Sequence, residues 1–154
     1  MKILKDTKVW VMPTDTIVGI HARAFDKEAI DRIYKLKGRR KSKKMIVLIS
    51  SLDQLKKFGI MLSKRQKGFL QKIWPGPVSV IIENQAFRMP ADTELLKLIS
   101  KTGPLVSTSA NISGKEHAKS VKEAKKIFGD KVDLYIEGKP KSKKPSIVIE
   151  IKRW

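Results

Sequence analysis

The sequence predicts one α/β or mixed α+β domain without a membrane-spanning helix, and three observations support this prediction. Short β-branched segments alternate along the chain with amphipathic segments that carry helix-capping signals. The chain has 154 residues, the size of one domain with one hydrophobic core, so we expect a single domain over residues 1–154. It contains no apolar stretch of about 18 residues, so no membrane-spanning helix is expected.

Six segments are predicted strands because they are short and rich in β-branched residues. They are residues 8–12, 45–50, 78–82, 104–108, 132–137 and 146–151. Their alternation with helical segments argues against a helix bundle and against a β-sandwich.

Helices are predicted between these strands from the signals at their ends. Asp26 is a candidate N-cap for a helix that runs to Leu36, and Gly38 supplies a left-handed stop. A serine followed three residues later by Gln or Glu, the pattern of a capping box, predicts helices that begin at Ser51, Ser63 and Ser120. A further helix is expected over residues 92–102. The segment 138–145, rich in lysine, serine and proline, predicts a mobile loop.

Positive charge dominates the composition, with 34 basic and 15 acidic residues and a formal net charge of +19. Seven of the cations lie within residues 35–44, and four more lie within residues 138–144. Such density predicts salt-sensitive attraction to a polyphosphate, either a nucleic acid or a nucleotide. Lysines that only keep a small protein soluble are the alternative interpretation.

Cysteine is absent, which excludes disulfides, thiolate zinc sites and a cysteine nucleophile. The first residues lack the apolar run of a signal peptide, so a cytoplasmic location is expected. His21 and His117 are the only histidines, and no metal-binding or serine-nucleophile motif accompanies them. An enzyme of this composition would act mainly by positioning its substrates and neutralising their charge.

Four motifs fall at predicted element ends, where ligand sites of open α/β sheets usually lie. The first, "PTDT" at residues 13–16, offers two hydroxyls and a carboxylate that either orient a ligand or simply form a turn. The second, "KGR" at residues 37–39, places two cations on either side of a glycine. This pair suits a phosphate or a carboxylate, and a solvated helix end is an equal alternative.

The third motif, "WPGPVS" at residues 74–79, precedes a strand and contains two prolines. Trp74 is interpreted as a core residue rather than a base-stacking surface, because the preceding helix already offers an apolar face. The fourth, "STSANISG" at residues 107–114, carries small hydroxyl and amide side chains directly after an apolar strand. Such side chains leave backbone amides and hydroxyls accessible to phosphate or ribose oxygens.

Taken in this order, the motifs resemble those of the YrdC/TsaC family of threonylcarbamoyl-AMP synthases. That family carries a "PTDTVYGL" turn, a "KGR" element, "WPGP" before a strand, an arginine two residues before a proline, an "STSANxSG" loop and a late "PSTIV"-like strand. The corresponding segments here are residues 13–20, 37–39, 74–77, Arg88 with Pro90, 107–114 and 145–148. The resemblance covers nearly the whole chain, and six motifs in one order are far more specific than any one of them.

The resemblance implies both a fold and a reaction. The fold would be a twisted mixed β-sheet flanked by helices, YrdC-like, with a concave basic surface. Threonine and bicarbonate would form a carbamate that attacks the α-phosphate of ATP, which releases pyrophosphate and leaves threonylcarbamoyl-AMP for the modification of adenosine in tRNA. ATP would bring Mg²⁺ held mainly by phosphate oxygens and water, so neither a protein metal site nor a tightly bound cofactor is implied. The partners implied are tRNA, through the basic surface, and other tRNA threonylcarbamoylation proteins, with no membrane partner.

Matching the motifs position by position assigns roles to individual residues. Lys37 and Arg39 would be catalytic, because they would neutralise the phosphates and the carbamate. ATP would be bound by Arg39, Ser109 and Asn111. Threonine would be bound by Thr16, Arg88, Ser107 and Ser146. Asp15 is expected to hold the turn.

The sequence departs from the family pattern at four places. Val18 stands where the family has a tyrosine, and Leu48 stands where some members carry a threonine-contacting histidine. The segment 83–87 is shorter than the usual excursion, and the chain ends at Trp154 where longer members continue. These departures and the +19 charge favour an alternative function, a non-catalytic protein that grips tRNA or double-stranded RNA by its phosphates. The intact KGR and STSAN motifs favour the enzyme.

Overall fold

A computed structural model describes residues 4–152 as one mixed sheet with helices packed around it. The strands are β1 (Trp10–Pro13), β2 (Val18–Arg23), β3 (Ile46–Leu48), β4 (Val78–Ile82), β5 (Gln85–Arg88), β6 (Leu105–Ser109), β7 (Leu134–Tyr135) and β8 (Ile147–Glu150). The α-helices are α1 (Lys27–Lys37), α2 (Lys64–Ile73), α3 (Thr93–Thr102) and α4 (Val121–Phe128), and two 3₁₀ helices are η2 (Leu52–Phe58) and η3 (Gly129–Lys131). The α/β class predicted from the sequence is confirmed.

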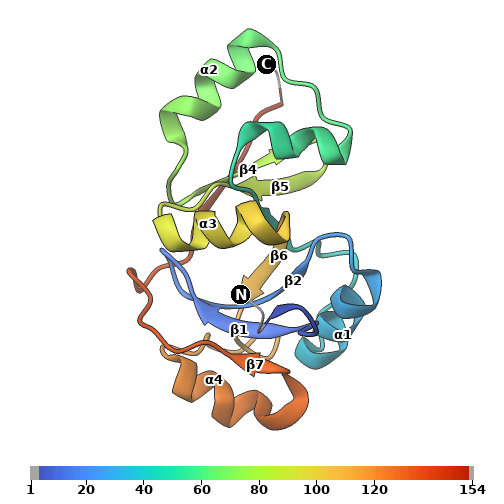
Figure 1. The fold of residues 1–154 in the computed structure, drawn as a ribbon, viewed down its shortest axis with the longest axis vertical. Coiled ribbons are helices and arrows are strands. Elements are labelled where there is room, and N and C mark those ends of the chain that lie inside the picture. The colour runs from blue at the N-terminus through green and yellow to red at the C-terminus, as the bar shows by residue number, and fades with distance from the viewer. Residues whose placement is uncertain (1–3, 153–154) are drawn as a thin grey trace.

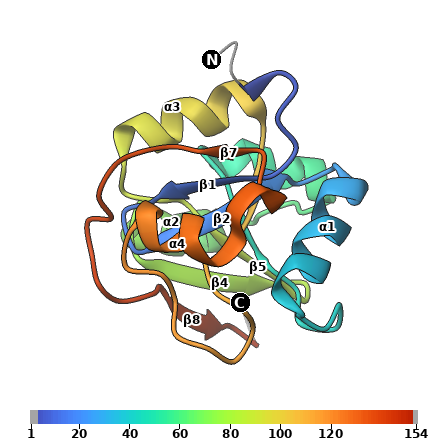
Figure 2. The same ribbon diagram turned by 90° about the horizontal axis from the view of Figure 1, so that it is seen from below.

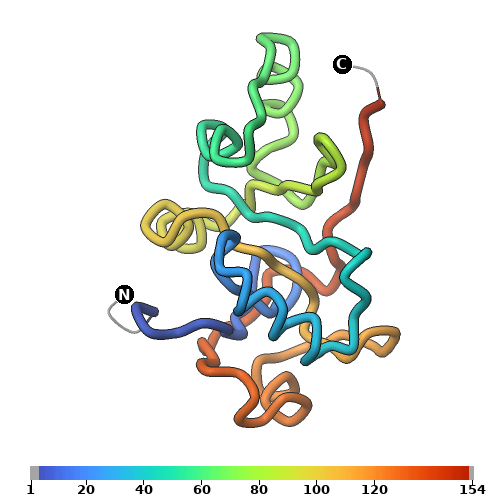
Figure 3. Tube along the Cα trace, turned by 90° about the vertical axis from the view of Figure 1, so that its right-hand side faces the viewer, coloured from blue at the N-terminus to red at the C-terminus, as the bar shows by residue number. Residues whose placement is uncertain are grey.

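The strand order in the sheet is β7-β1-β2-β6-β3-β5-β4-β8. β2 pairs antiparallel with both β1 and β6, whereas β7 and β8 pair in parallel with β1 and β4, so the sheet is mixed. Figure 1 shows α2 at one end of the long axis and α4 at the other. The last strand runs from the middle of the molecule toward the α2 end, as the tube in Figure 3 shows from the side. None of the helices within residues 4–152 is long and apolar enough to cross a membrane.

All six predicted strands form, but β2 and β5 lie where no strand was predicted. β2 contains Gly19 and His21, which interrupt its run of β-branched residues. β5 begins directly after Glu83 and Asn84, whose φ angles of 48° and 65° make a two-residue hairpin turn to β4. The segment 83–87 is therefore a tight turn followed by the start of a strand.

The helix ends agree with their capping signals at most positions. Asp26 accepts a hydrogen bond from Ala29 N, and Gly38 closes α1 in the left-handed region. Ser63 and Gln66 form the predicted capping box at α2, and Ser120 caps α4. A helix also begins after Ser51 as predicted, but it is a 3₁₀ helix without the capping box, because the Gln54 side chain accepts from Ser50 N.

Alternation along the strands gives the sheet two different faces. On one, which we call the core face, Val18, Ile20 and Val106 join the larger hydrophobic cluster together with residues of α1 and α4. On the other, which we call the open face, Trp10 and Leu105 belong to a smaller cluster with α3. Figure 2 shows α3 and α4 on opposite sides of β1. Trp74 is buried in the larger cluster, which confirms its interpretation as a core residue.

Candidate functional site

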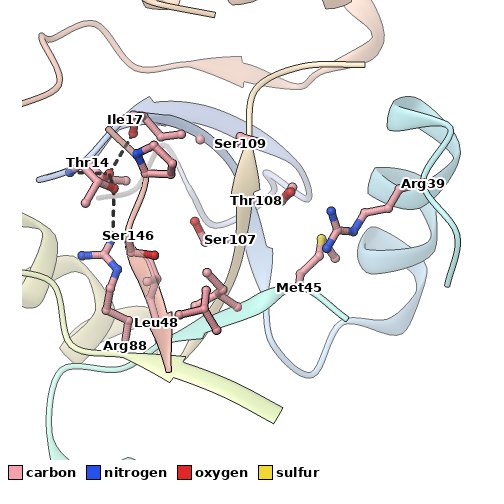
Figure 4. Close-up of a pocket in the computed structure, with 15 residues that line it drawn as sticks. Thr14, Ile17, Arg39, Met45, Leu48, Arg88, Ser107, Thr108, Ser109 and Ser146 are labelled. Atoms are coloured by element: carbon pink, nitrogen blue, oxygen red, sulfur yellow. Dashed lines mark hydrogen bonds between the residues drawn. The ribbon is translucent and has the colours of Figure 1, made fainter. Parts of the chain in front are cut away.

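A cavity of about 220 Å³, which we call the first cavity, lies at the open face (Figure 4). Six of the predicted site residues line it, namely Thr16, Arg39, Arg88, Ser107, Ser109 and Ser146. They come from the turn after β1, the segment after α1, and strands or loops far apart in the sequence. The structure therefore brings together motifs that are separated by up to about 130 residues of chain.

The first cavity exists because small residues occupy part of the open face. The register of β2 with β6 places Gly19 opposite Ser109 and His21 opposite Ser107. Residues directly opposite in an antiparallel pair share one face of the sheet. α3 packs on larger residues of this face, while Gly19, Ser107 and Ser109 leave space beside it. Gly19 was not predicted as a site residue. The sequence feature that could have indicated it is a glycine between two β-branched residues, Val18 and Ile20, which marks a place where a strand leaves space for a ligand.

Arg88 and Asp15 form a buried ion pair at the wall of the first cavity. Arg88 is only 3% exposed, and its Nη1 donates to both carboxylate oxygens of Asp15 at 2.8 Å. Asp15 also accepts from Ala91 N at 2.9 Å, and Arg88 Nη2 lies 3.4 Å from Thr16 Oγ1. The Asp15 carboxylate binds Arg88 and Ala91 rather than the backbone of its own turn, so it orients Arg88, and the prediction that it holds the turn is wrong.

The two threonine side chains of the PTDT turn have different surroundings. Thr14 Oγ1 donates to Ile17 O at 2.8 Å and accepts from Thr16 N at 3.1 Å, which is the hydrogen bonding of a threonine turn. Thr16 Oγ1 lies between Thr14 Oγ1, at 3.0 Å, and Arg88 Nη2. Thr14 therefore holds the backbone, and it holds the Thr16 hydroxyl beside the Arg88 guanidinium.

Lys37 is buried beneath the STSANISG loop and does not line the first cavity. Its side chain is 1% exposed, and Nζ donates to Asn111 Oδ1 at 2.7 Å, Asn111 O at 2.9 Å and Ser109 O. Ser109 Oγ donates to the same Asn111 Oδ1 at 2.7 Å. Burial, assisted by the neighbouring charge of Arg39, lowers the pKa of Lys37 to about 8. With three acceptors for its three N–H groups, Lys37 ties the end of α1 to the loop after β6.

Asn111, like Lys37, lies outside the lining of the first cavity, whereas Arg39 belongs to it. The Asn111 amide donates to Lys115 O at 2.7 Å, so both ends of this side chain hold its own loop. Arg39 Nε and Nη2 donate to Lys43 O at 2.9 Å and Lys44 O at 3.0 Å. Within residues 4–152, Arg39 Nη1 has no protein partner, and Figure 4 shows the guanidinium directed toward Met45 at the cavity. Of the two cations of the KGR motif, only Arg39 is therefore available to a ligand.

The segment 138–146 crosses the PTDT turn as a strap. Lys141 N donates to Thr14 O at 3.2 Å, Ser142 N donates to Thr16 O at 3.0 Å, and Lys141 Nζ pairs with Asp92 at 3.2 Å. Ser146 Oγ is hydrogen-bonded to Ser79 Oγ at 2.9 Å. These contacts anchor a segment whose composition had predicted a mobile loop, and they deliver Ser146 to the first cavity.

A second cavity, of about 730 Å³, lies on the other side of the PTDT turn. Its lining includes four lysines against one glutamate, from the strap and from residues 116–120. Ile17 lines both cavities, whereas Val18 lines only the second and Leu48 only the first. The valine at position 18, where the family has a tyrosine, therefore alters the lining of the second cavity and not that of the first.

His21 is completely buried next to the first cavity. Among residues 4–152, no hydrogen-bond partner is found for either ring nitrogen of His21 or for the indole nitrogen of Trp10. Burial lowers the pKa of His21 to about 3, so the imidazole is neutral. A Cβ at Gly19 would lie 2.8 Å from His21 Nε2, so the ring fills the space beside Gly19. No group of three or more His, Asp or Glu side chains suited to a metal ion occurs among residues 4–152.

Comparison with known proteins places this arrangement in a family. The Sua5/YciO/YrdC family, described as "Telomere recombination", matches residues 2–153. The chain belongs to the Sua5/YciO/YrdC family. The resemblance inferred from the six motifs is confirmed.

Relatives with curated names include the threonylcarbamoyl-AMP synthases of Pyrococcus abyssi and Chromobacterium violaceum. That of Pyrococcus abyssi is 29% identical over 167 residues, which cover 98% of this chain and 49% of that protein. That of Chromobacterium violaceum is 31% identical over 166 residues, which cover 97% of this chain and 86% of that protein. The chain therefore spans about half of the first relative and most of the second.

Solved structures of the family share the fold. Pyrococcus abyssi Sua5 complexed with L-threonine superposes with a TM-score of 0.85 at 28% identity, over 99% of this chain and 50% of that one. Escherichia coli YciO gives a TM-score of 0.83 at 22% identity, over 99% of this chain and 82% of that one. The mixed sheet with its flanking helices is thus the family fold.

Proposed function

We propose that this protein is a threonylcarbamoyl-AMP synthase that uses L-threonine, bicarbonate and ATP for the modification of adenosine in tRNA. The observation that carries the proposal is the buried Arg88 guanidinium, held by Asp15 at the wall of a hydroxyl-lined cavity. A fixed guanidinium beside hydroxyls suits the carboxylate of an amino acid. The threonine in the Pyrococcus abyssi Sua5 complex and the names of the relatives support the same substrate.

Threonine fits the first cavity in size and chemistry. Its carboxylate would be bound by Arg88, and its hydroxyl and amine by Thr16, Ser107 and Ser146. Leu48 offers the threonine methyl group an apolar contact where a histidine stands in some relatives. A space of about 220 Å³ suits an amino acid and its carbamate, and it is too small for the whole adenylate.

ATP would extend from the first cavity toward the second. Arg39, at the rim of the first cavity, would contact the phosphates through its unpartnered Nη1, and the Ser109 hydroxyl would turn from Asn111 Oδ1 to donate to an adjoining oxygen. The lysines of the second cavity add positive charge, and its volume of about 730 Å³ suits a nucleoside. Lys37 and Asn111 would act by fixing the loop that carries Ser109. A Mg²⁺ ion would arrive with the triphosphate as part of the substrate.

The reaction then needs positioning and charge neutralisation more than a strong base. The threonine amine joins bicarbonate with loss of water, and a carbamate oxygen attacks the α-phosphorus of ATP in line with the departing pyrophosphate. Both the attacking carbamate and the phosphate are anions, so Arg39 would lower the barrier by neutralising them, while Arg88 holds the threonine carboxylate. As a nucleotidyl transfer, this chemistry does not require a nucleophilic side chain.

Release of pyrophosphate that depends on threonine tests the proposal. The protein is incubated with ATP, Mg²⁺, bicarbonate and threonine, and pyrophosphate is measured with and without threonine. Arg39→Ala should lower turnover at least about a hundredfold, because it removes a charge that acts in the transition state. Arg40→Ala is the matched control, since Arg40 is an exposed neighbour outside the first cavity. Absence of threonine-dependent release from the folded wild-type protein would refute the proposed function.

A second candidate function, RNA binding without catalysis, is favoured by the exposed cations at residues 40–44, next to Arg39. Together with the net charge of +19, they would attract the phosphates of tRNA. Titration of the protein with tRNA and with ATP at two salt concentrations separates the candidates. Steep loss of RNA affinity with salt and no ATP binding would support the RNA-binding protein, whereas ATP binding supports the enzyme.

A further inference from the structure

A third cavity, of about 610 Å³, lies at the far end of β2 from the first cavity. It is formed by the turn between β2 and α1, the end of η2, and the turn between α3 and β6. Gly19, which lines the first cavity, and Arg23, which lines the third, are four residue steps apart, or about 13 Å along the strand. Nothing in the proposed reaction uses this third cavity.

An exposed aromatic ring forms one wall of the third cavity. Phe25 is 59% exposed, and its ring stacks on Phe58 with centroids 4.9 Å apart and an interplanar angle of 28°. Phe58 in turn meets the completely buried Phe87 edge to face at 5.1 Å. The three rings form a ladder that connects the surface to the larger core cluster. The Phe25 ring is therefore an exposed apolar surface whose orientation is fixed by its contact with Phe58.

The charge at the mouth of the third cavity is positive. Lys27 and Lys57 line it and are exposed, and neither forms an ion pair within residues 4–152. The one carboxylate in the lining, that of Asp26, is already bound by Ala29 N at 3.0 Å and by Lys8 Nζ at 3.2 Å. The two lysine charges are thus left for a ligand, and they flank the exposed ring.

We propose that the third cavity binds single-stranded RNA, with one base stacked on Phe25 and the adjoining phosphates contacted by Lys27 and Lys57. An aromatic ring between cations is the chemistry by which proteins hold unpaired nucleotides. Duplex RNA does not fit this site, because its bases are already stacked on one another. The site is independent of the proposed synthase reaction, since its residues do not line the first cavity.

Fluorescence anisotropy with labelled decauridine tests the proposal, with a ten-base-pair RNA duplex as the comparison. Phe25→Ala should weaken decauridine binding about tenfold, since stacking on an aromatic ring contributes that much per base. Phe25→Leu should weaken it as much, because leucine keeps the apolar contact with Phe58 but has no ring. Phe25→Trp should retain binding. Lys57→Gln should reduce the slope of log affinity against log salt by about 0.7, the value for one contact to a single strand.

Two controls separate this site from general attraction to anions. Met61→Ala removes another exposed apolar side chain, which is 76% exposed and outside the third cavity, and should leave decauridine binding unchanged. Duplex affinity should be the same for wild-type protein and Phe25→Ala. The proposal is overturned if Phe25→Leu binds decauridine as tightly as wild type does. It is also overturned if Phe25→Ala weakens the binding of the duplex, or of an acidic peptide, by the same factor.

Discussion

The two faces of the central sheet use the same strands for different purposes. In β2, Val18 and Ile20 are completely buried in the core face, while Gly19 between them borders the first cavity. In β6, Val106 packs in the core, while Ser107 lines the cavity. Because side chains along a strand point alternately to opposite faces, neighbouring residues serve stability or ligand binding in turn. A substitution on the core face should therefore lower stability and leave activity nearly unchanged, whereas a substitution on the open face beside the first cavity should also lower activity.

His21 is the exception to this division, and the largest effect is expected there. It lies on the open face, yet it is completely buried and its pKa is lowered to about 3, whereas an unfolded histidine titrates near 6.5. As the pH falls through this window, the unfolded chain takes up a proton that the folded chain does not. The free energy of unfolding should therefore fall by about 5 kcal/mol between pH 6.5 and pH 3 through this residue alone.

Urea unfolding of wild type and His21→Leu at pH 7, 5 and 4 measures this effect. The variant should lose much less stability in acid than wild type does, and the difference should grow as the pH falls. Equal acid sensitivity of the two proteins would contradict the assignment of His21 as a neutral buried group.

Ile20→Ala tests the core face and has the next largest expected effect. The side chain is completely buried in the larger cluster, so its truncation should lower the free energy of unfolding by about 3 kcal/mol. Pyrophosphate release per folded molecule should remain within about twofold of wild type. Ser109→Ala is the corresponding variant on the open face. It should lower the free energy of unfolding by only about 1 kcal/mol but should clearly lower activity. If both variants lose stability and activity in the same proportion, the two faces do not divide these roles.

Gly19→Ala should lower both stability and activity, and its effect on stability should be smaller than that of Ile20→Ala. The new Cβ would lie 2.8 Å from His21 Nε2 and 3.2 Å from Thr108 O, which forces the ring to move and lowers stability by about 2 kcal/mol. Thermal unfolding measures the loss. The double variant Gly19→Ala with His21→Ala should recover part of the stability, because it removes the clashing ring. If the double variant does not recover stability, the contact with His21 is not the reason why position 19 requires a glycine.

Lys37 should give the smallest effect, a loss of activity at alkaline pH. Its pKa is about 8 in the folded chain, so above that pH the amine has fewer N–H groups for Ser109 and Asn111. Between pH 8 and 10.5 the unfolded lysine keeps its proton while the folded one loses it, so this group makes the free energy of unfolding rise with pH. Turnover should therefore fall several-fold from pH 7 to 9 without a loss of stability from this residue. A flat activity profile across this range would contradict the role of Lys37 in fixing the loop.

Local signals predicted the helices well and two strands not at all. Helix ends depend on backbone groups within a few residues, so Asp26 and Ser63 were sufficient to locate them. β2 was not predicted because Gly19 and His21 are poor strand formers by themselves. They lie in a strand because both neighbours, β1 and β6, supply hydrogen bonds and the open face needs a small residue there. The β propensities of the residues themselves do not indicate such long-range pairing.

The candidate site was predictable as a set of motifs but not as a geometry. The motifs named six residues that do line the first cavity, but Asn111, which binds Lys37, and Asp15, which binds Arg88, lie more than 70 residues away from them in the chain. No sequence pattern indicates that Lys37 is buried and fully bonded, or that Asp15 holds Arg88. The contribution of the strap also depends on hydrogen bonds to the PTDT turn rather than on its own composition.

Calorimetric titration with L-threonine tests the central claim that Arg88, held by Asp15, binds the amino acid in the first cavity. Wild-type protein and Arg65→Gln, a control at an exposed arginine of α2, should bind one threonine with equal affinity. Arg88→Gln combined with Asp15→Asn avoids an unpaired buried charge and should fold, yet it should not bind threonine. Equal threonine binding by this double variant and by wild type would contradict the account.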